Sequence, residues 1–257
     1  MIIESTYGNK IHKGVDRRKT DLNQLINKTI KAGGSVLIPA FSIERTEEIL
    51  YDLNDLINAG KLKNIPIYLD SPLSKNILTV YQKHTYLFND SAIKKIKQGD
   101  DIFNFPNFTI IDDSLQSLKI INDREPKVIL AGSGMLSGGR IINYLPVYLT
   151  QKNNTIIFIS YQAKNTIGEK LIQGRKTVMI EGKKIKAKCN IAQISAYSSH
   201  ADKRKLHSFV KNIKHPTPQT IFINHGDVDQ SSGFKQELSK KSKAKLIIPE
   251  IGKNYQI

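Results

Sequence analysis

The chain has 257 residues and a formal net charge of +16, from 39 Lys and Arg against 23 Asp and Glu. A positive field of this size favours a polyanionic partner such as nucleic acid, although abundant lysines on a solvated surface give the same balance. The single cysteine, Cys189, excludes an internal disulfide and a zinc centre built from cysteines, and it fits a reducing compartment.

Apolar runs typical of buried strands alternate along the chain with amphipathic segments typical of helices. After Ile2-Ile3-Glu4, strands are expected at SVLIPAF (35–41), IPIYLD (65–70), FTIID (108–112), KVILAG (127–132), TIIFIS (155–160), QTIFIN (219–224) and KLIIPE (245–250). Helices are expected in segments 21–34, 45–60, 71–84, 140–149 and 166–174, from Asp202, and near 234–242. This alternation predicts an α/β fold with a mostly parallel sheet flanked by helices.

Local signals refine this outline. Ser71 and Pro72 suit the cap and the first position of the helix at 71–84. A hairpin around Gly182 is expected within residues 177–194, and residues 95–107 are a candidate loop. No leader peptide and no apolar stretch near the roughly 20 residues that cross a bilayer are visible, so a soluble, cytoplasmic protein without a membrane partner is expected.

Nearly every expected strand ends in small, polar or ionisable residues. In parallel sheets, ligands bind beyond the carboxyl ends of the strands, so such ends indicate a shared functional face. The strand ends in question are Glu4-Ser5-Thr6, Ser42, Asp70-Ser71, Gly132-Ser133-Gly134 and His225-Gly226-Asp227.

The stretch AGSGMLSGGR (131–140) is a Gly/Ser loop between a strand and a helix. Small residues allow backbone N–H groups to approach an anion, and the positive charge of Arg140 also favours phosphate binding. The loop does not match the Walker or dinucleotide spacing, and a tight structural turn is the alternative.

Two histidines are candidates for chemistry. His200 lies two residues before Asp202 and could act in acid–base catalysis, and His225 at a strand end could bind a metal. Glu4 could orient a histidine across such a site. From spacing alone, structural or merely exposed histidines remain the alternative.

Taken together and in order, ESTYGNKIH, GGSVLIPAFSIERTEEIL, IPIYLDSPLS, AGSGMLSGGRIINYL, SAYSSHAD and INHGD resemble the β-CASP branch of the metallo-β-lactamase superfamily. This branch contains RNA-processing nucleases such as ribonuclease J and the cleavage and polyadenylation endonuclease. The resemblance runs from Glu4 to about residue 250. It implies that residues 1–12 are the last strand of a first metallo-β-lactamase half, that 13–190 are the β-CASP domain, and that 191–257 are the returning segment of an αββα sandwich.

The resemblance also implies a function, the hydrolysis of an RNA phosphodiester by two zinc ions and an activated water. Glu4 corresponds to the family's acid that orients a histidine, His200 to that histidine facing the scissile phosphate, and His225 to a zinc ligand. The residues matching RNA- and phosphate-binding motifs are Ser133, Gly134, Met135, Ser71 and Arg45.

Several positions depart from the family pattern. Glu44 precedes Arg45 where a small residue is common, Asn143 stands where a histidine is frequent, and Asn224 where an apolar residue is usual. The family's His-x-His-x-Asp-His zinc motif does not occur among the histidines of this chain, which are His12, His84, His200, His207, His215 and His225.

A catalytic zinc needs about three protein ligands, and His225 is the one family ligand identified here. We therefore expect the C-terminal portion of a zinc ribonuclease, inactive by itself, that lacks the N-terminal zinc-binding half. Such a portion would pair with a separate N-terminal half or form a homo-oligomer. The alternatives are a non-catalytic RNA-binding module that uses a basic β-CASP cleft, and an unrelated phosphate-handling enzyme such as a nucleotidase using Asp70.

Overall fold

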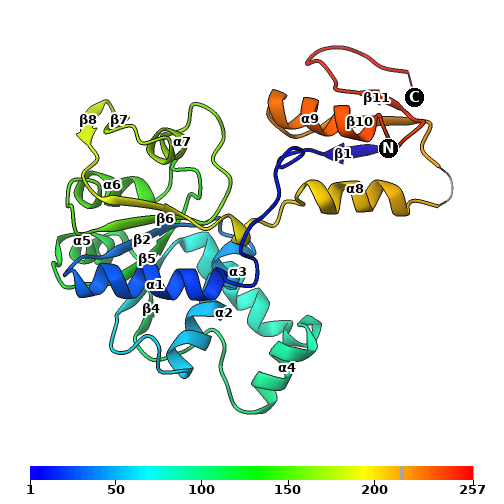
Figure 1. The fold of residues 1–257 in the computed structure, drawn as a ribbon. Coiled ribbons are helices and arrows are strands. Elements are labelled where there is room, and N and C mark those ends of the chain that lie inside the picture. The colour runs from blue at the N-terminus through cyan, green and yellow to red at the C-terminus, as the bar shows by residue number, and fades with distance from the viewer. Residues whose placement is uncertain (215–216, 257) are drawn as a thin grey trace. The chain divides into compact units, whose positions relative to one another are not determined.

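The structure, a computed structural model, describes residues 1–214 and 217–256. The chain divides into two compact units (Figure 1). The large unit is Gly14–Tyr197, and the small unit combines Met1–Lys13 with Ser198–Ile257. Across the described ranges, no helix has the length and apolarity that a bilayer crossing requires.

Six parallel strands form the sheet of the large unit, in the order β4-β3-β5-β2-β6-β9. They are β2 (Val36–Pro39), β3 (Ile67–Asp70), β4 (Phe108–Ile110), β5 (Val128–Ala131), β6 (Thr155–Phe158) and β9 (Asn190–Gln193). Strands β2, β5 and β6 are buried along their whole length, as parallel strands covered on both faces must be. The predicted α/β fold class is confirmed.

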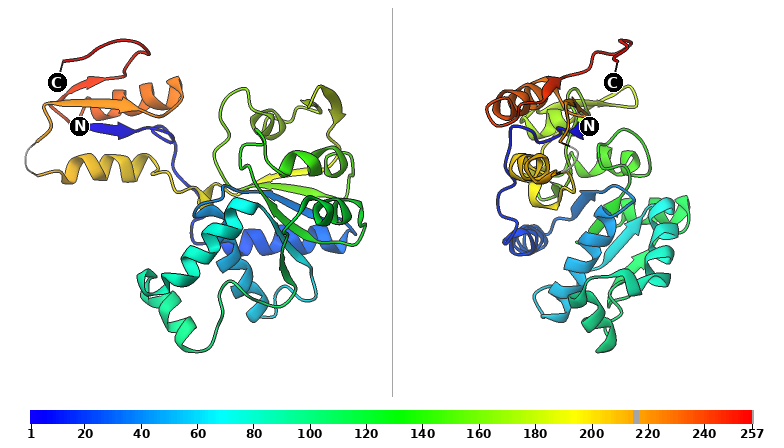
Figure 2. Two further views of the ribbon diagram at one scale, coloured as in Figure 1. Left: turned by 180° about the vertical axis from the view of Figure 1, so that it is seen from behind. Right: turned by 90° about the vertical axis from the view of Figure 1, so that its right-hand side faces the viewer.

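Helices cover both faces of this sheet (Figure 2). One core includes residues of α1 (Arg18–Lys31), α2 (Arg45–Asn58), α3 (Pro72–Lys83) and α4 (Asp90–Lys97), and the other includes residues of α5 (Ser114–Asn122), α6 (Ile141–Tyr148) and α7 (Ile167–Ile172). Alternation along β2 serves both cores, because Val36 and Ile38 enter the first and Leu37 the second. The short helices η1 (Thr85–Leu87) and η2 (Ser195–Tyr197) complete the unit, together with the antiparallel pair β7 (Thr177–Ile180) and β8 (Lys183–Lys186).

The small unit contains a parallel sheet of three strands, in the order β1-β10-β11. These are β1 (Ile2–Glu4), β10 (Thr220–Asn224) and β11 (Lys245–Ile247), accompanied by α8 (Lys203–Asn212) and α9 (Val228–Leu238). Strands and helices share one core, whose buried members are Ile3, Leu206, Ile221, Ile223, Phe234 and Leu238. In the β1–β10 register Glu4 pairs with Asn224, so the carboxyl ends of these two strands lie side by side.

Two local expectations are confirmed and two are corrected. Ser71 caps α3 by accepting a hydrogen bond from the Ser74 amide, with Pro72 at the first helical position, and the hairpin forms at residues 177–186. Residues 190–193, expected within that hairpin, instead pair with β6 in the large sheet. Helix α9 begins at Val228 rather than near Phe234, and it contains Gly233 because a Cβ there would lie 2.7–2.9 Å from Asn9 side-chain atoms.

Candidate active site

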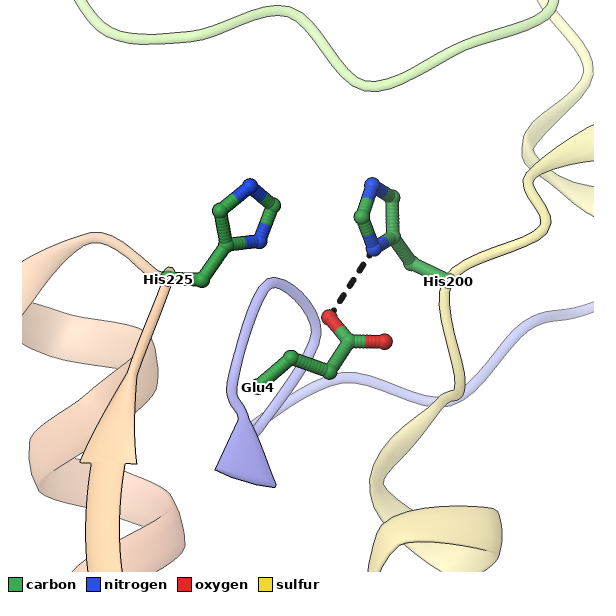
Figure 3. Close-up of side chains that lie close together, drawn as sticks. All are labelled: Glu4, His200 and His225. Carbon is green, nitrogen blue, oxygen red and sulfur yellow. Dashed lines mark hydrogen bonds and ion pairs between the residues drawn. The ribbon is translucent and has the colours of Figure 1, made fainter. Parts of the chain in front are cut away.

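Three segments far apart in sequence bring the candidate catalytic side chains together in the small unit. Glu4 ends β1, His225 follows the last residue of β10, and His200 lies just before α8. The side chain of Asp202 fixes the start of α8 by accepting a hydrogen bond from the Lys205 amide. Figure 3 shows both imidazole rings beside the Glu4 carboxylate, so the structure places these three predicted residues in one cluster.

The Glu4 carboxylate is held by hydrogen bonds on both of its oxygens. Oε2 lies 2.9 Å from Nδ1 of His200 and 3.2 Å from the Thr6 amide, and Oε1 accepts from the Ala201 amide at 3.0 Å. Burial raises the pKa of this carboxyl, but hydrogen bonds from Thr6 and Ala201 and the charge of His200 outweigh it, so the pKa lies below its ordinary value. Glu4 is therefore an anion at neutral pH, and Nδ1 of His200 donates its proton to it.

His225 occupies a tight turn that two small neighbours make possible. Its φ of 48° lies in the left-handed region, and the next residue, Gly226, packs against Ser5. A Cβ on Gly226 would lie 2.5 Å from the carbonyl oxygen and 2.5 Å from the hydroxyl oxygen of Ser5. The Ser5 hydroxyl in turn donates to the Asn224 carbonyl at 2.8 Å, which fixes the end of β10.

The donor set of this cluster has the chemistry of a metal site. Among the described residues, Glu4, His200 and His225 form the one group of three or more His, Cys, Asp or Glu side chains whose ligand atoms lie within 4.8 Å of one another. Two imidazoles and a carboxylate are ligands that zinc accepts. Because Glu4 and His200 already bond to each other, the set fits a zinc ion bound through His225 better than a complete two-zinc centre.

The candidate phosphate-binding residues lie in the large unit. Strands β3, β5 and β2 are neighbours, and Ser71, Gly132 and Ser42 follow them near the same edge of the sheet. The Ser71 and Ser42 hydroxyl oxygens lie 3.2 Å apart, and a Cβ on Gly132 would lie 3.4 Å from the former. Ser71 is 5% exposed and bonds to both the amide and the hydroxyl of Ser74, so its side chain holds structure at this edge.

The loop 131–140 is tightly packed. The amide of Ser133 donates to the Gly138 carbonyl at 3.1 Å, and the Ser133 hydroxyl accepts from the Ser137 amide at 3.1 Å. Gly134 is buried, and a Cβ there would lie 3.1 Å from Phe41. Met135, next to it, is partly exposed. A phosphate-binding role for Ser133, Gly134 and Met135 stays a prediction.

Arg45, the first residue of α2, is engaged with other groups of the protein. Arg45 forms an ion pair with Glu48, donates to the Tyr197 carbonyl, and lies 3.3 Å from Glu44. Its side chain is only 11% exposed, so a direct contact with RNA is limited to a small part of the guanidinium.

Asp70 is fully buried between an arginine and a tyrosine. One carboxylate oxygen pairs with Arg140, and the other accepts from the Tyr144 hydroxyl at 2.6 Å. Arg140 also donates to the carbonyls of Asp112 and Asp113. This arrangement ties β3 to the segment before α5 and engages both carboxylate oxygens of Asp70 with protein groups.

Sequence reasoning missed the polar residues that support the cluster. Thr6 is 4% exposed, and its hydroxyl lies 3.3 Å from Nδ1 of His200 and 3.2 Å from Nδ1 of His225. Nε2 of His12 lies 2.9 Å from the carbonyl oxygen of His200. The available signal was the position of the hydroxyl residues Ser5 and Thr6 directly after an acid at a strand end.

Comparison with protein-family models matches two successive regions of the chain. Residues 46–171 match the Beta-Casp domain, and residues 184–249 match the Zn-dependent metallo-hydrolase RNA specificity domain. The first region lies within the large unit, and the second includes α8, β10 and α9 of the small unit.

Three relatives are similar in sequence to nearly the whole of this chain. A transcription termination factor FttA of Methanosarcina mazei is 31% identical over 255 residues, which are 95% of this chain and 40% of the relative. Ribonuclease TTHA0252 of Thermus thermophilus is 29% identical over 90% of this chain and 52% of its own length. An RNase J-like protein of Methanocaldococcus jannaschii is 33% identical over 98% of this chain and 58% of its own length. The chain thus spans about half the length of these relatives.

Proposed function

The chain belongs to the β-CASP family of metallo-hydrolases, and we propose that it supplies the acid–histidine pair, one zinc-ligating histidine and an RNA-binding face of a ribonuclease. The observation that carries this proposal is the Glu4–His200 pair beside His225 at one sheet edge. RNA as substrate is supported by the net charge of +16, by the match to an RNA specificity domain, and by relatives named as ribonucleases.

In this proposal His200 transfers a proton at the scissile phosphate, and Glu4 holds His200 in place. The anionic Glu4 accepts the Nδ1 proton of His200 at 2.9 Å, which fixes the ring. In its cationic form His200 carries a second proton, on Nε2. As a water oxygen bonds to phosphorus and the leaving P–O bond breaks, Nε2 gives this proton to the leaving oxygen, and the neutral Nδ1–H imidazole remains. A proton released by the attacking water restores the cation. Glu4 acts by orienting the imidazole and by stabilising its cationic form.

Zinc, when bound, supplies Lewis-acid stabilisation of the phosphate and an activated water at neutral pH. His225 is the residue of this chain that would hold it. Because Glu4 and His200 are bonded to each other, we propose that the other zinc ligands come from outside residues 1–257, from a metallo-β-lactamase half or from a second copy of these residues. Residues 1–257 alone then do not cleave RNA.

Two preparations test this function. The purified chain, incubated with Zn²⁺ and end-labelled RNA, should retain less than one zinc per chain and release no cleavage product. A complex isolated from the source cells through a tag on this chain should cleave RNA, and the same complex carrying His200→Ala should not. Two tightly bound zinc ions on the isolated chain would contradict the incomplete site, and cleavage that survives His200→Ala would contradict the proposed role of the pair.

A non-catalytic RNA-binding module is the second candidate, favoured by the strong positive charge. It predicts an RNA affinity that falls steeply with salt, because bound phosphates displace counterions. It also predicts no cleavage by either preparation. Cleavage by the isolated complex that depends on His200 distinguishes the two candidates.

A further inference from the structure

One buried hydroxyl, that of Thr6, contacts both histidines of the candidate active site. Thr6 Oγ1 lies 3.0 Å from the His225 carbonyl oxygen, 3.2 Å from Nδ1 of His225 and 3.3 Å from Nδ1 of His200. The Thr6 amide donates to the Glu4 carboxylate at 3.2 Å. The two imidazole rings, with centroids 5.2 Å apart, therefore share a single hydroxyl partner.

The position of the protons follows from counting donors. A threonine hydroxyl has one proton to donate and lone pairs that accept. Nδ1 of His200 is already a donor, because its nearer partner is the anionic Glu4 at 2.9 Å. The Thr6 proton therefore goes to the His225 carbonyl or to Nδ1 of His225.

Of these two acceptors, the carbonyl oxygen is the nearer, at 3.0 Å against 3.2 Å for the ring nitrogen. The Thr6 hydroxyl has the geometry of a donor to this carbonyl. Because the Thr6 hydroxyl donates its proton to the His225 carbonyl, Oγ1 offers only a lone pair to Nδ1 of His225. That nitrogen then carries a hydrogen.

We propose that Thr6 is a positioning residue that holds His225 as the Nδ1–H tautomer, leaving the lone pair on Nε2. Histidines that bind metals commonly donate their other ring N–H to a protein acceptor, which fixes both tautomer and ring orientation. The inference rests on the proposed function only in taking Nε2 of His225 as the nitrogen that faces zinc. The tautomer itself is a property of the chain without metal or RNA.

Loss of the Thr6 hydroxyl should affect the two histidines unequally. His200 keeps its 2.9 Å bond to Glu4, whereas Nδ1 of His225 has Thr6 as its one hydrogen-bond partner within residues 1–214 and 217–256. Thr6→Val, which preserves the branched shape, should therefore release the tautomer of His225 and leave that of His200 in place. A purely packing role for Thr6 would not produce this asymmetry.

The test is long-range ¹H–¹⁵N correlation spectroscopy of the metal-free chain at a pH where imidazoles are neutral, about two units above their ordinary pKa of about 6.5. In the unsubstituted chain, His225 should show a protonated-type Nδ1 and an unprotonated Nε2. Thr6→Val should move His225 towards the tautomer mixture of a free, exposed histidine. Thr6→Ser, which keeps the hydroxyl, should restore the original pattern.

Thr29→Val is the matched control. Thr29 is also 4% exposed, and its hydroxyl bonds to Thr155 and to the Leu25 carbonyl within the large unit. This variant makes the same chemical change and should leave both histidine patterns unaltered.

An Nε2–H pattern at His225 in the unsubstituted chain would overturn the proposal, and so would a folded Thr6→Val variant in which His225 keeps its Nδ1–H form. If Thr6→Val does not fold, the unsubstituted chain and Thr6→Ser still decide the tautomer. A different tautomer at His225 would not contradict the proposed RNA cleavage, and absence of cleavage would not contradict the proposed tautomer. The two proposals are therefore judged separately.

Discussion

The two units both place polar residues at the carboxyl ends of parallel strands, but they leave different atoms available to a ligand. At the small-unit edge the imidazole of His200 is partly exposed and that of His225 is exposed, both beside Glu4. At the large-unit edge Ser42 and Ser71 bond to each other. From this comparison we expect ionisable side chains to carry the proposed chemistry at the first edge, and the backbone of loop 131–140 to make any phosphate contact at the second.

Removal of the buried charge at the large-unit edge should have the largest effect. Asp70→Asn leaves Arg140 without its anionic partner, and breaking a buried ion pair in this way typically costs about 3–5 kcal/mol of unfolding free energy. Urea unfolding followed at large-unit amide signals measures the loss. The imidazole signals of His200 and His225 should not change.

Asp112→Asn provides the control for that change. Asp112 pairs with Lys75 on the surface with a side chain 59% exposed, so the same substitution should cost less than about 1 kcal/mol. Equal losses in the two variants would show that Asp70 does not anchor the large-unit edge as the structure indicates.

The glycines that follow the strand ends offer a second contrast. Gly226→Ala would force a Cβ to 2.5 Å from two oxygen atoms of Ser5, and we expect the small unit to lose about 3 kcal/mol by overpacking. Gly132→Ala meets its nearest neighbour, the Ser71 hydroxyl oxygen, at 3.4 Å and should cost far less. Unfolding followed separately in each unit makes the comparison. A Gly226→Ala variant with unchanged stability would contradict the tight turn at His225.

Sequence periodicity was enough to predict most strands and helices, because their apolar residues repeat with clear periods and the central strands β2, β5 and β6 are buried along their whole length. Spacing alone left Glu4, His200 and His225 as candidates among structural or exposed residues, and the family resemblance singled them out. Their assembly requires the pairing of β1 with β10 across more than 200 positions, and no local pattern encodes that pairing. The resemblance implied a partnership of Glu4 with His200 but no strand pairing.

Supporting contacts were the part that sequence could not supply. Thr6 and Gly226 matter because of atoms from other segments that approach them, and the engagement of Arg45 with Glu48 and the Tyr197 carbonyl depends on tertiary packing. The start of α9 was misplaced because Gly233 resembles a helix breaker unless the approach of Asn9 is known.

Two acids should give the units opposite pH dependence. Burial raises the pKa of Glu47, in α2, from 4.5 to about 7, so the folded large unit binds a proton that the unfolded chain has released. Its stability should therefore fall as pH rises from about 4.5 to 7. Glu47→Gln should remove this fall, a gain at pH 8 relative to pH 5 of no more than about 3 kcal/mol at 1.36 kcal/mol per pKa unit.

Glu4 acts in the other direction. Because its pKa in the folded small unit lies below 4.5, its contribution is present above that pH and is lost as pH falls through the folded value. Glu4→Gln should flatten the acid side of the small-unit stability curve. Unit-resolved urea unfolding between pH 3 and 8 checks both signs, and parallel curves for the two variants would refute the contrast.

Ser71→Ala should have the smallest effect and bears most directly on the difference between the two edges. The substitution removes the side-chain cap of α3, which typically costs about 1 kcal/mol. Because the Ser71 hydroxyl is buried and bonded to Ser74, we expect the affinity for a short single-stranded RNA to stay within about twofold while the large unit loses that stability. Fluorescence anisotropy at low salt measures the affinity, with Ser137→Ala as a matched serine change on the exposed part of loop 131–140. A tenfold loss of affinity in Ser71→Ala alone would show that the Ser71 hydroxyl binds an RNA phosphate. Side chains would then contact the ligand at the large-unit edge as well as at the small-unit edge.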